Sequence, residues 1–416
     1  MELLRFATAG SVDDGKSTLI GRLLYDSKQI FEDTIEALEH STRLRGEEGV
    51  NLALLTDGLR AEREQGITID VAYRYFATPT RKFIIADTPG HIQYTRNMVT
   101  GASTADVAVV LVDARKGVIE QTRRHTFISA TLGIPHIVFA INKMDLVDFA
   151  EARFREIEAD LGELSDRLGV QDEMAIPIAA LPGDNVVEPS ERMPWWDGGT
   201  FLERLEAIEI GVDRDASHRR FPVQWVIRPM TDAHHDYRGY AGDVAGGEWR
   251  AGDEVVVLPS GLKTTVATVE THDGPLDVAV QEQAVVVRLT DAIDVARGDM
   301  LCDPADPPVV ARELEAIVCW MSERPVAPGA RLAIKHTTRW SRAILEEIVS
   351  VLDLSNFDQV AADGLGLNDL ARVRLRLATP LMVDPYEANR ATGAFILVDE
   401  SVNETVGAGM VLSASA

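Results

Sequence analysis

The chain has 416 residues, 46% of them hydrophobic and 26% charged, which is too long for a single core, so we expect two or three domains. Its net charge of −25 argues against extended contact with nucleic-acid phosphates, and we do not expect a nucleic acid as partner. The two cysteines are too few for a disulfide framework or a zinc cluster. Because the chain runs directly into an apolar strand and has no apolar run long enough to cross a bilayer, we expect neither a signal peptide nor a membrane span, and predict a cytoplasmic protein.

The first half of the chain alternates strand and helix patterns. Strands are predicted at Leu3–Ala9, Val71–Phe76, Phe83–Asp87, Val107–Val112, His136–Asn142 and Met174–Ile178. Helical patterns cover Gln93–Ala102, Ile119–Leu132 and Ala150–Leu168. This alternation is typical of a mostly parallel sheet with helices on both faces. We therefore predict an α/β P-loop domain over residues 1–210.

After residue 210 the pattern changes to short β-type runs separated by glycine-bearing turns. The earlier runs are Val223–Val226, Glu254–Leu258, Thr264–Val269 and Ala284–Leu289. A proline-rich break at Cys302–Pro308 precedes the later runs, which are Glu313–Trp320, Arg331–Lys335, Ile344–Leu352, Ala371–Leu377, Gly393–Val398 and Thr405–Leu412. We predict two antiparallel β-barrel domains, at 211–306 and 307–416.

A phosphate-binding loop follows the first predicted strand and fits the spacing G-x-x-x-x-G-K-S/T. The loop and the residue after it read Gly10-Ser11-Val12-Asp13-Asp14-Gly15-Lys16-Ser17-Thr18. The backbone N–H groups of such a loop converge on an anion, and the dipole of the following helix adds to the attraction. We expect Lys16 to reach the β- and γ-phosphates of a nucleotide and the Ser17 hydroxyl to bind Mg²⁺.

Two later segments carry groups that suit a γ-phosphate and its metal. In Arg63–Ile69, Thr68 offers a hydroxyl to Mg²⁺ and a backbone N–H to the γ-phosphate, as a nucleotide-dependent switch does. Asp87 ends a buried strand and is followed by Thr-Pro-Gly-His, so Asp87 is expected to hold Mg²⁺ and the Gly90 N–H to contact the γ-phosphate. His91 stands where a side chain would orient the attacking water. We predict Lys16, Thr68 and His91 as the catalytic residues.

A further pair of segments selects the base. In Asn142-Lys143-Met144-Asp145, the Asp145 carboxylate would accept from the N1–H and the exocyclic amine of guanine, donors that adenine lacks. Lys143 would cover the base with its alkyl stem, and Asn142 would tie loops together. In Ile178-Ala179-Ala180-Leu181, the backbone N–H of Ala180 is the expected partner of guanine O6.

This arrangement resembles the translation-factor class of GTPases, which includes elongation factor Tu and has a G domain followed by two β-barrels. The resemblance covers the whole chain and is closer still to the GTPase subunits of bacterial ATP sulfurylase. Elongation factors typically carry histidine at the positions of Ser11 and Asp14 and threonine in place of Ser17. Further segments of resemblance are Thr18–Asp26, Phe221–Gln224, Arg238–Gly242, Lys335–Thr338 and Glu404–Met410.

The sequence departs from its relatives in two places, at Ala179 and in the region Ser27–Ala61, which is long for a first switch. Many relatives have serine at the Ala179 position, so we expect weakened rather than lost guanine binding. Val12 and Ile67 match an apolar gate beside the catalytic histidine, and Asp13 matches a position that binds a monovalent cation.

The resemblance also implies a reaction and a partner. It implies a GTPase that couples GTP hydrolysis, with GTP and Mg²⁺ as cofactors, to formation of adenylylsulfate and pyrophosphate from ATP and sulfate on a catalytic subunit in a heteromeric complex. These residues contain no second phosphate loop and no ATP-adenylylating signature, so adenylyl transfer would take place on the partner. Two alternatives remain: a translation factor that delivers aminoacyl-tRNA, and a scaffold that binds GTP without hydrolysing it.

Overall fold

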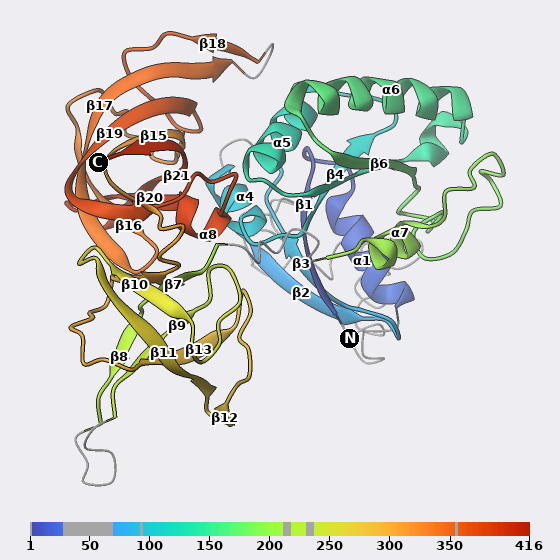
Figure 1. Ribbon diagram of the computed structural model, residues 1–416. Coiled ribbons are helices and arrows are strands. Elements are labelled where there is room, and N and C mark those ends of the chain that lie inside the picture. Colours follow the sequence, from blue (N-terminus) through green and yellow to red (C-terminus); the bar gives the residue numbers. More distant parts are fainter. Residues whose placement is uncertain (1, 28–69, 92–94, 211–217, 230–236, 354–356) are drawn as a thin grey trace. The chain divides into compact units, whose positions relative to one another are not determined.

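The computed structural model describes residues 2–27, 70–91, 95–210, 218–229, 237–353 and 357–416 (Figure 1). These residues fall into two compact units. Unit 1 reaches to Ile210, and unit 2 consists of the later residues.

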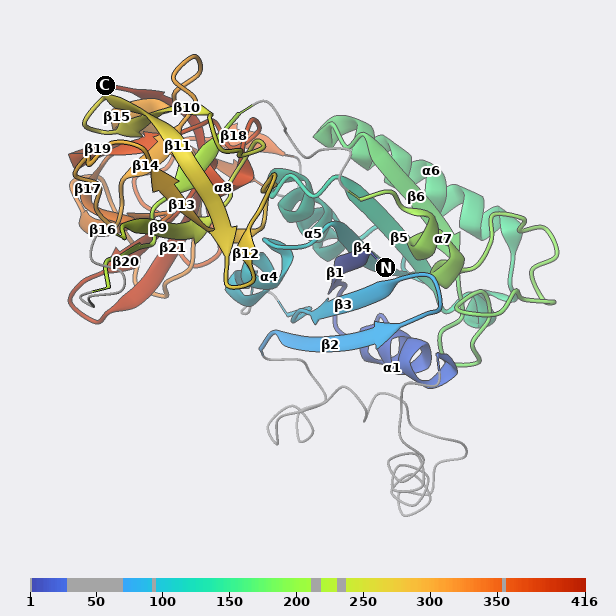
Figure 2. The ribbon, with the colours of Figure 1, turned by 60° about the horizontal axis from the view of Figure 1, so that its bottom comes forward.

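Unit 1 is built on a six-stranded sheet with the strand order β2-β3-β1-β4-β5-β6. Its strands are β1 (Leu3–Ala9), β2 (Ala72–Ala77), β3 (Lys82–Asp87), β4 (Val107–Asp113), β5 (His136–Asn142) and β6 (Asp172–Pro177). All neighbouring pairs are parallel except β2 with β3, and Figure 2 shows β2 as the edge strand beside β3. Every residue of β4 is buried, as expected for a strand covered on both faces.

Helices cover both faces of this sheet. They are α1 (Lys16–Asp26), α4 (Thr95–Ala102), α5 (Glu120–Thr131), α6 (Glu151–Leu168) and α7 (Phe201–Ala207). Figure 1 shows α5 and α6 on one face and α1 and α7 on the other. Leu19 and Leu23 of α1 and Phe201 of α7 pack in one apolar cluster with alternate residues of the strands, such as Val109 and Leu111. Since β1, β3, β4 and β5 are parallel, the loops that follow them lie at one edge of the sheet.

Unit 2 begins with an antiparallel sheet that remains open within the described residues. Its strands follow the path β7-β14-β10-β11-β13-β9-β8, and β12 pairs with β11. They are β7 (Arg220–Pro222), β8 (Trp225–Ile227), β9 (Gly239–Asp243), β10 (Glu254–Leu258), β11 (Leu262–Thr271), β12 (Gly274–Pro275), β13 (Ala284–Leu289) and β14 (Met300–Cys302). Its core surrounds the buried Trp249 and Phe221, whose ring centroids lie 5.5 Å apart.

The remaining strands of unit 2 form a closed barrel. The order β16-β20-β21-β15-β19-β17 closes because β16 also pairs with β17, while β18 extends from β17. The elements are β15 (Val309–Trp320), β16 (Arg331–His336), β17 (Arg339–Asp353), β18 (Asp358–Val360), β19 (Leu370–Val383), helix α8 (Arg390–Gly393), β20 (Ala394–Asp399) and β21 (Glu404–Ser415). The predicted fold class is thus confirmed, with the first barrel open and the second closed. The predicted division at 306/307 falls between β14 and β15 and stays a prediction.

A buried polar network joins the two barrels of unit 2. Arg220 of β7, 1% exposed, places Nε and one terminal nitrogen each 2.9 Å from an oxygen of Asp384, which follows β19. The Thr392 hydroxyl donates to Asp384 over 2.6 Å, and a ring nitrogen of His336 lies 2.7 Å from the Thr392 carbonyl oxygen. The Lys335–Thr338 segment thus supplies a buried group to this network.

Two other features of the sequence have structural roles. Trp195 and Trp196 belong to a packed loop, in which their indole N–H groups donate to the carbonyl oxygens of Phe149 and Gly199 over 3.0 and 2.8 Å. Cys302 and Cys319 are free thiols and are buried. None of the described helices combines the length and the apolar character needed to cross a membrane.

Candidate functional site

The phosphate loop connects β1 to α1 at the edge where the parallel strands end. Gly15 precedes the first helical residue with a φ of 93°, a left-handed conformation that favours glycine. A Cβ there would also overlap the side-chain amide of Asn142. The loop residues Gly10, Ser11, Val12, Asp13, Asp14, Gly15, Lys16, Ser17 and Thr18 therefore have the strand, loop and helix context that the motif needs.

Lys16 and Asp87 face each other between this loop and the end of β3. The Lys16 ammonium lies 3.5 Å from an Asp87 oxygen and donates to the Thr88 carbonyl oxygen. Both side chains are buried, and burial raises the pKa of Asp87 above its ordinary value. The Thr88 hydroxyl donates to the Thr8 carbonyl oxygen over 2.6 Å, which ties β3 to β1 at the site.

Gly90 brings the segment that carries His91 against the phosphate loop. A Cβ on Gly90 would overlap the carbonyl oxygen of Gly10, so only glycine fits this close approach of two backbones. Gln121 of α5 donates to the Gly90 carbonyl oxygen over 3.0 Å and lies 3.2 Å from a ring nitrogen of His125. The bond from Gln121 holds the peptide group that links Gly90 to His91, and His91 itself is half-buried.

Asn142 joins three loops of the site. Its side-chain oxygen accepts from the backbone N–H groups of Lys143 and Ala180 over 2.8 and 2.9 Å. Its side-chain nitrogen donates to the Asp14 carbonyl oxygen over 2.8 Å. Lys143 in turn donates to the Asp13 carbonyl oxygen, so the base-selecting segment holds the backbone of the phosphate loop. This agrees with the predicted role of Asn142 in tying loops together.

The other residues predicted to select the base flank this junction. Asp145 lies half-buried in the 3₁₀ helix Met144–Val147, which begins directly after Lys143. Ala179 and Ala180 are buried, whereas Leu181 is 67% exposed. The N–H of Ala180 that was expected to meet guanine O6 donates to Asn142 in this structure.

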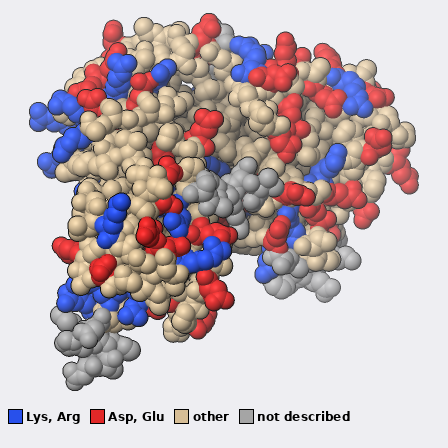
Figure 3. All heavy atoms as spheres, in the orientation of Figure 1, with Lys and Arg blue, Asp and Glu red and all other residues tan. Residues whose placement is uncertain are grey.

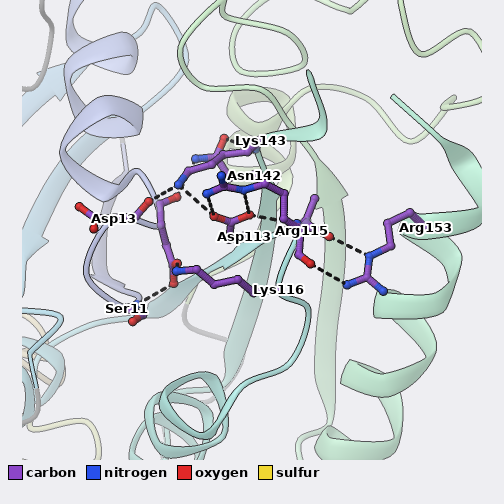
Figure 4. A network of polar contacts seen from close by, with 10 residues as sticks. Ser11, Asp13, Asp113, Arg115, Lys116, Asn142, Lys143 and Arg153 are labelled. Atoms are coloured by element: carbon purple, nitrogen blue, oxygen red, sulfur yellow. Dashed lines mark hydrogen bonds and ion pairs between the residues drawn. The ribbon is translucent and has the colours of Figure 1, made fainter. Parts of the chain in front are cut away.

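Asp113, at the end of β4, anchors a group of cations beside the loop (Figure 4). Arg115 contacts its carboxylate twice, at 3.0 and 2.6 Å, and the Lys143 ammonium lies 3.0 Å away. Burial opposes ionisation of Asp113, but the hydrogen bonds from Arg115 and Lys143 outweigh it and hold its pKa well below the usual value. Asp113 therefore stays ionised and fixes Lys143 near the loop.

Several residues of the site were missed by sequence reasoning. Arg22 of α1 lies 3.3 Å from the Ala180 carbonyl oxygen and also donates to the Leu181 carbonyl oxygen, which anchors the base-selecting loop. Asp113 is the last residue of β4, Arg115 and Lys116 lie in the loop after it, and Gln121 lies on α5. Their position after a parallel strand at the site edge was the one available signal.

Some predicted residues cannot be placed. Thr68 and Ile67 lie outside the described residues. Ser17, on the first turn of α1, and Asp87 are a hydroxyl and a carboxylate, the oxygen donors that Mg²⁺ prefers. Within the described part of the chain no three His, Cys, Asp or Glu residues cluster as a metal site. This donor set suits a metal held mainly by phosphate and water oxygens.

Comparison with known proteins identifies the family. The family model of the elongation factor Tu GTP binding domain matches residues 1–237, and that of the GTP-eEF1A C-terminal domain-like family matches residues 313–412. The chain is 55% identical over 412 residues to a "Bifunctional enzyme CysN/CysC" of Mycobacterium tuberculosis (strain ATCC 25618 / H37Rv), covering 99% of this chain and 67% of that protein.

Two proteins called "Sulfate adenylyltransferase subunit 1" are similar over nearly the whole chain. The one from Bacteroides fragilis (strain YCH46) is 52% identical over 413 residues, covering 99% of this chain and 86% of its own length. The one from Aeromonas hydrophila subsp. hydrophila is 51% identical over 412 residues, with the same coverage of 99% and 86%. The chain belongs to the sulfate adenylyltransferase subunit 1 family, whose nucleotide domain is of the elongation factor Tu type.

Proposed function

We propose that this chain binds GTP with Mg²⁺, hydrolyses it, and uses the hydrolysis to drive adenylylsulfate formation on a partner subunit. The observation that carries the proposal is the set of hydrogen bonds that joins the phosphate loop, the Asp87–His91 segment and the Asn142–Asp145 segment at one edge of one sheet. Family membership over 99% of the chain supports it.

Different residues contact different parts of the nucleotide and its metal. The loop N–H groups and Lys16 bind the phosphates, Ser17, Thr68 and Asp87 hold Mg²⁺, and the Asp145 carboxylate selects guanine. Bound Mg²⁺ neutralises charge on the β- and γ-phosphates.

His91 has the hydrolytic role. It orients the water that attacks the γ-phosphorus, which gives GDP and phosphate. Its peptide is held by Gln121 and by contact of Gly90 with the phosphate loop, so its backbone is fixed relative to the phosphates.

Coupling explains why a GTPase belongs with a sulfate-activating enzyme. Transfer of AMP from ATP to sulfate forms a phosphosulfate anhydride and releases pyrophosphate, and this step alone is strongly uphill. The Asp87–His91 segment and the region of Thr68 change contacts when the γ-phosphate leaves, and a partner that binds these segments receives that change.

Co-purification with a catalytic ATP sulfurylase subunit tests the proposal. We expect a stable complex that forms adenylylsulfate from ATP and sulfate in greater yield with GTP than with a non-hydrolysable GTP analogue. Yields that do not depend on GTP, or failure to form a complex, would contradict the proposal.

A second candidate is a translation factor that delivers aminoacyl-tRNA, since the matching G-domain family is that of elongation factor Tu. The charge of −25 disfavours it, and on the face in Figure 3 basic side chains are interspersed with acidic ones. Filter binding of charged tRNA to the GTP form decides between the two, because the translation factor requires tight, salt-sensitive binding.

A further inference from the structure

The phosphate loop carries a buried carboxylate of its own. Asp14 is 2% exposed, and one of its oxygens accepts from the Ser11 backbone N–H over 2.8 Å. The Asp14 N–H donates back to the Ser11 carbonyl oxygen over 3.2 Å. The side chain therefore closes the turn Ser11–Asp14 on itself, and burial raises its pKa.

Lys116 supplies the cation that faces this carboxylate. Its ammonium lies 3.2 Å from the other Asp14 oxygen, and its side chain is 38% exposed, so it reaches from the surface to a buried acid. Lys116 follows β4, is 102 residues from Asp14 in the chain, and was absent from the predicted site.

The loop that carries Lys116 is itself anchored. The backbone N–H groups of Lys116 and Gly117 both donate to the Asp113 carbonyl oxygen over 2.9 Å. Arg153 of α6 donates to the Ala114 carbonyl oxygen over 2.8 Å. Because these bonds already fix the loop backbone, less backbone freedom is lost when the ion pair forms.

The ion pair between Lys116 and Asp14 affects the charge that a bound nucleotide meets. A phosphate loop binds its ligand through converging N–H dipoles, and an ionised carboxylate in that loop repels the phosphates. Lys116 cancels the charge of Asp14 while leaving its hydrogen bond to Ser11 in place. Without Lys116, a buried carboxylate would be left without its cation beside a polyanion, which is unfavourable for the loop and for the ligand.

We propose that Lys116 is a positioning residue for the nucleotide: through its ion pair with Asp14 it holds the Ser11–Asp14 turn closed and neutralises it, and so slows nucleotide dissociation. The inference rests on the proposed binding of guanine nucleotides. The residue it names, Lys116, lies in a loop outside the nucleotide-binding motifs.

Dissociation of a fluorescent GDP tests this on the full chain. We would load the protein with N-methylanthraniloyl-GDP, add excess GDP, and follow release by stopped flow. For a pair that is neither fully buried nor fully exposed, we expect Lys116→Met to release the nucleotide about tenfold faster. Lys116→Arg should restore a rate near the wild-type value, and Lys82→Met, which removes an exposed lysine of β3, serves as control.

A double-mutant cycle with Asp14→Asn separates the pair from other effects. In the Asp14→Asn background, Lys116→Met should change the rate less than twofold. The inference is overturned if Lys116→Met releases GDP at the wild-type rate, if Arg does not rescue, or if the effect is unchanged in the Asp14→Asn background. A wild-type chain that binds no guanine nucleotide would instead reject the proposed function.

Discussion

Asn142 is the side chain whose removal should loosen the site most. Replacing it by alanine removes the acceptor of the Lys143 and Ala180 N–H groups and the donor to the Asp14 carbonyl oxygen. The side chain is 2% exposed, so water does not readily replace these partners. Asn142→Ala should therefore release the phosphate loop and the base-selecting loop from each other.

The three lost bonds set the size of the effect. Each buried polar group left unsatisfied costs about 1–3 kcal/mol, so the lower limit for three is about 3 kcal/mol. If the ordered loops are required to bind the nucleotide, this loss corresponds to about a 100-fold weaker affinity for GDP. We expect most of it in a faster dissociation rate, because the contacts hold the bound state.

Asn389→Ala is a matched control for this prediction. Asn389 is 7% exposed, its nitrogen donates to the Ala245 carbonyl oxygen over 2.9 Å, and its oxygen accepts from the N–H groups of Ala391 and Thr392 over 3.0 Å. It thus makes as many bonds as Asn142, but in unit 2. It should lower the thermal stability and leave the dissociation of fluorescent GDP unchanged.

Two results would contradict the prediction for Asn142→Ala. Should Asn142→Ala bind GDP within threefold of the wild type while its circular dichroism spectrum stays native, the three contacts do not hold the nucleotide site together. Equal acceleration of GDP release in both variants would assign the effect to general loss of stability.

Three further outcomes are expected. His91→Ala should slow single-turnover GTP hydrolysis about 100-fold with GDP affinity nearly unchanged, and equal rates would remove His91 from the mechanism. Burial, with Lys16 nearby, lowers the pKa of His125 to about 3. The unfolded chain, with its ordinary pKa of about 6.5, therefore takes up the proton first, so stability present above pH 6.5 falls by about 2 kcal/mol towards pH 5. Urea unfolding should show this loss in the wild type and a smaller one in His125→Gln. Asp384→Ala, which removes the buried carboxylate that pairs with Arg220 and leaves only the exposed Asp306 near it, should destabilise unit 2 by about 3 kcal/mol in the same assay, whereas Arg220→Met with Asp384→Leu should lose much less.

Much of the fold was predictable because its signals are local. Buried parallel strands give continuous apolar runs, and glycine-bearing turns between short β runs indicate barrels, so the fold class and most element positions followed from the sequence. Helix α6 was predicted within one residue, since its apolar periodicity ends at a glycine. Whether the second barrel closes was not predictable, because the ring also needs β15 to pair with β19 and β21, and β16 with β20, and these strands are far apart in the sequence.

The phosphate and base motifs could be predicted because the functional groups of each lie within a few consecutive residues, as in Gly10–Ser17 and Asn142–Asp145. What the sequence alone determined is therefore the fold class and the segments that we propose to contact a guanine nucleotide. Tertiary structure alone decided that Asn142 bonds to Asp14, 128 residues away, and that Lys116 pairs with the same residue. Such contacts arise where separate strands end at one edge of a sheet, and no local pattern encodes which side chains meet there.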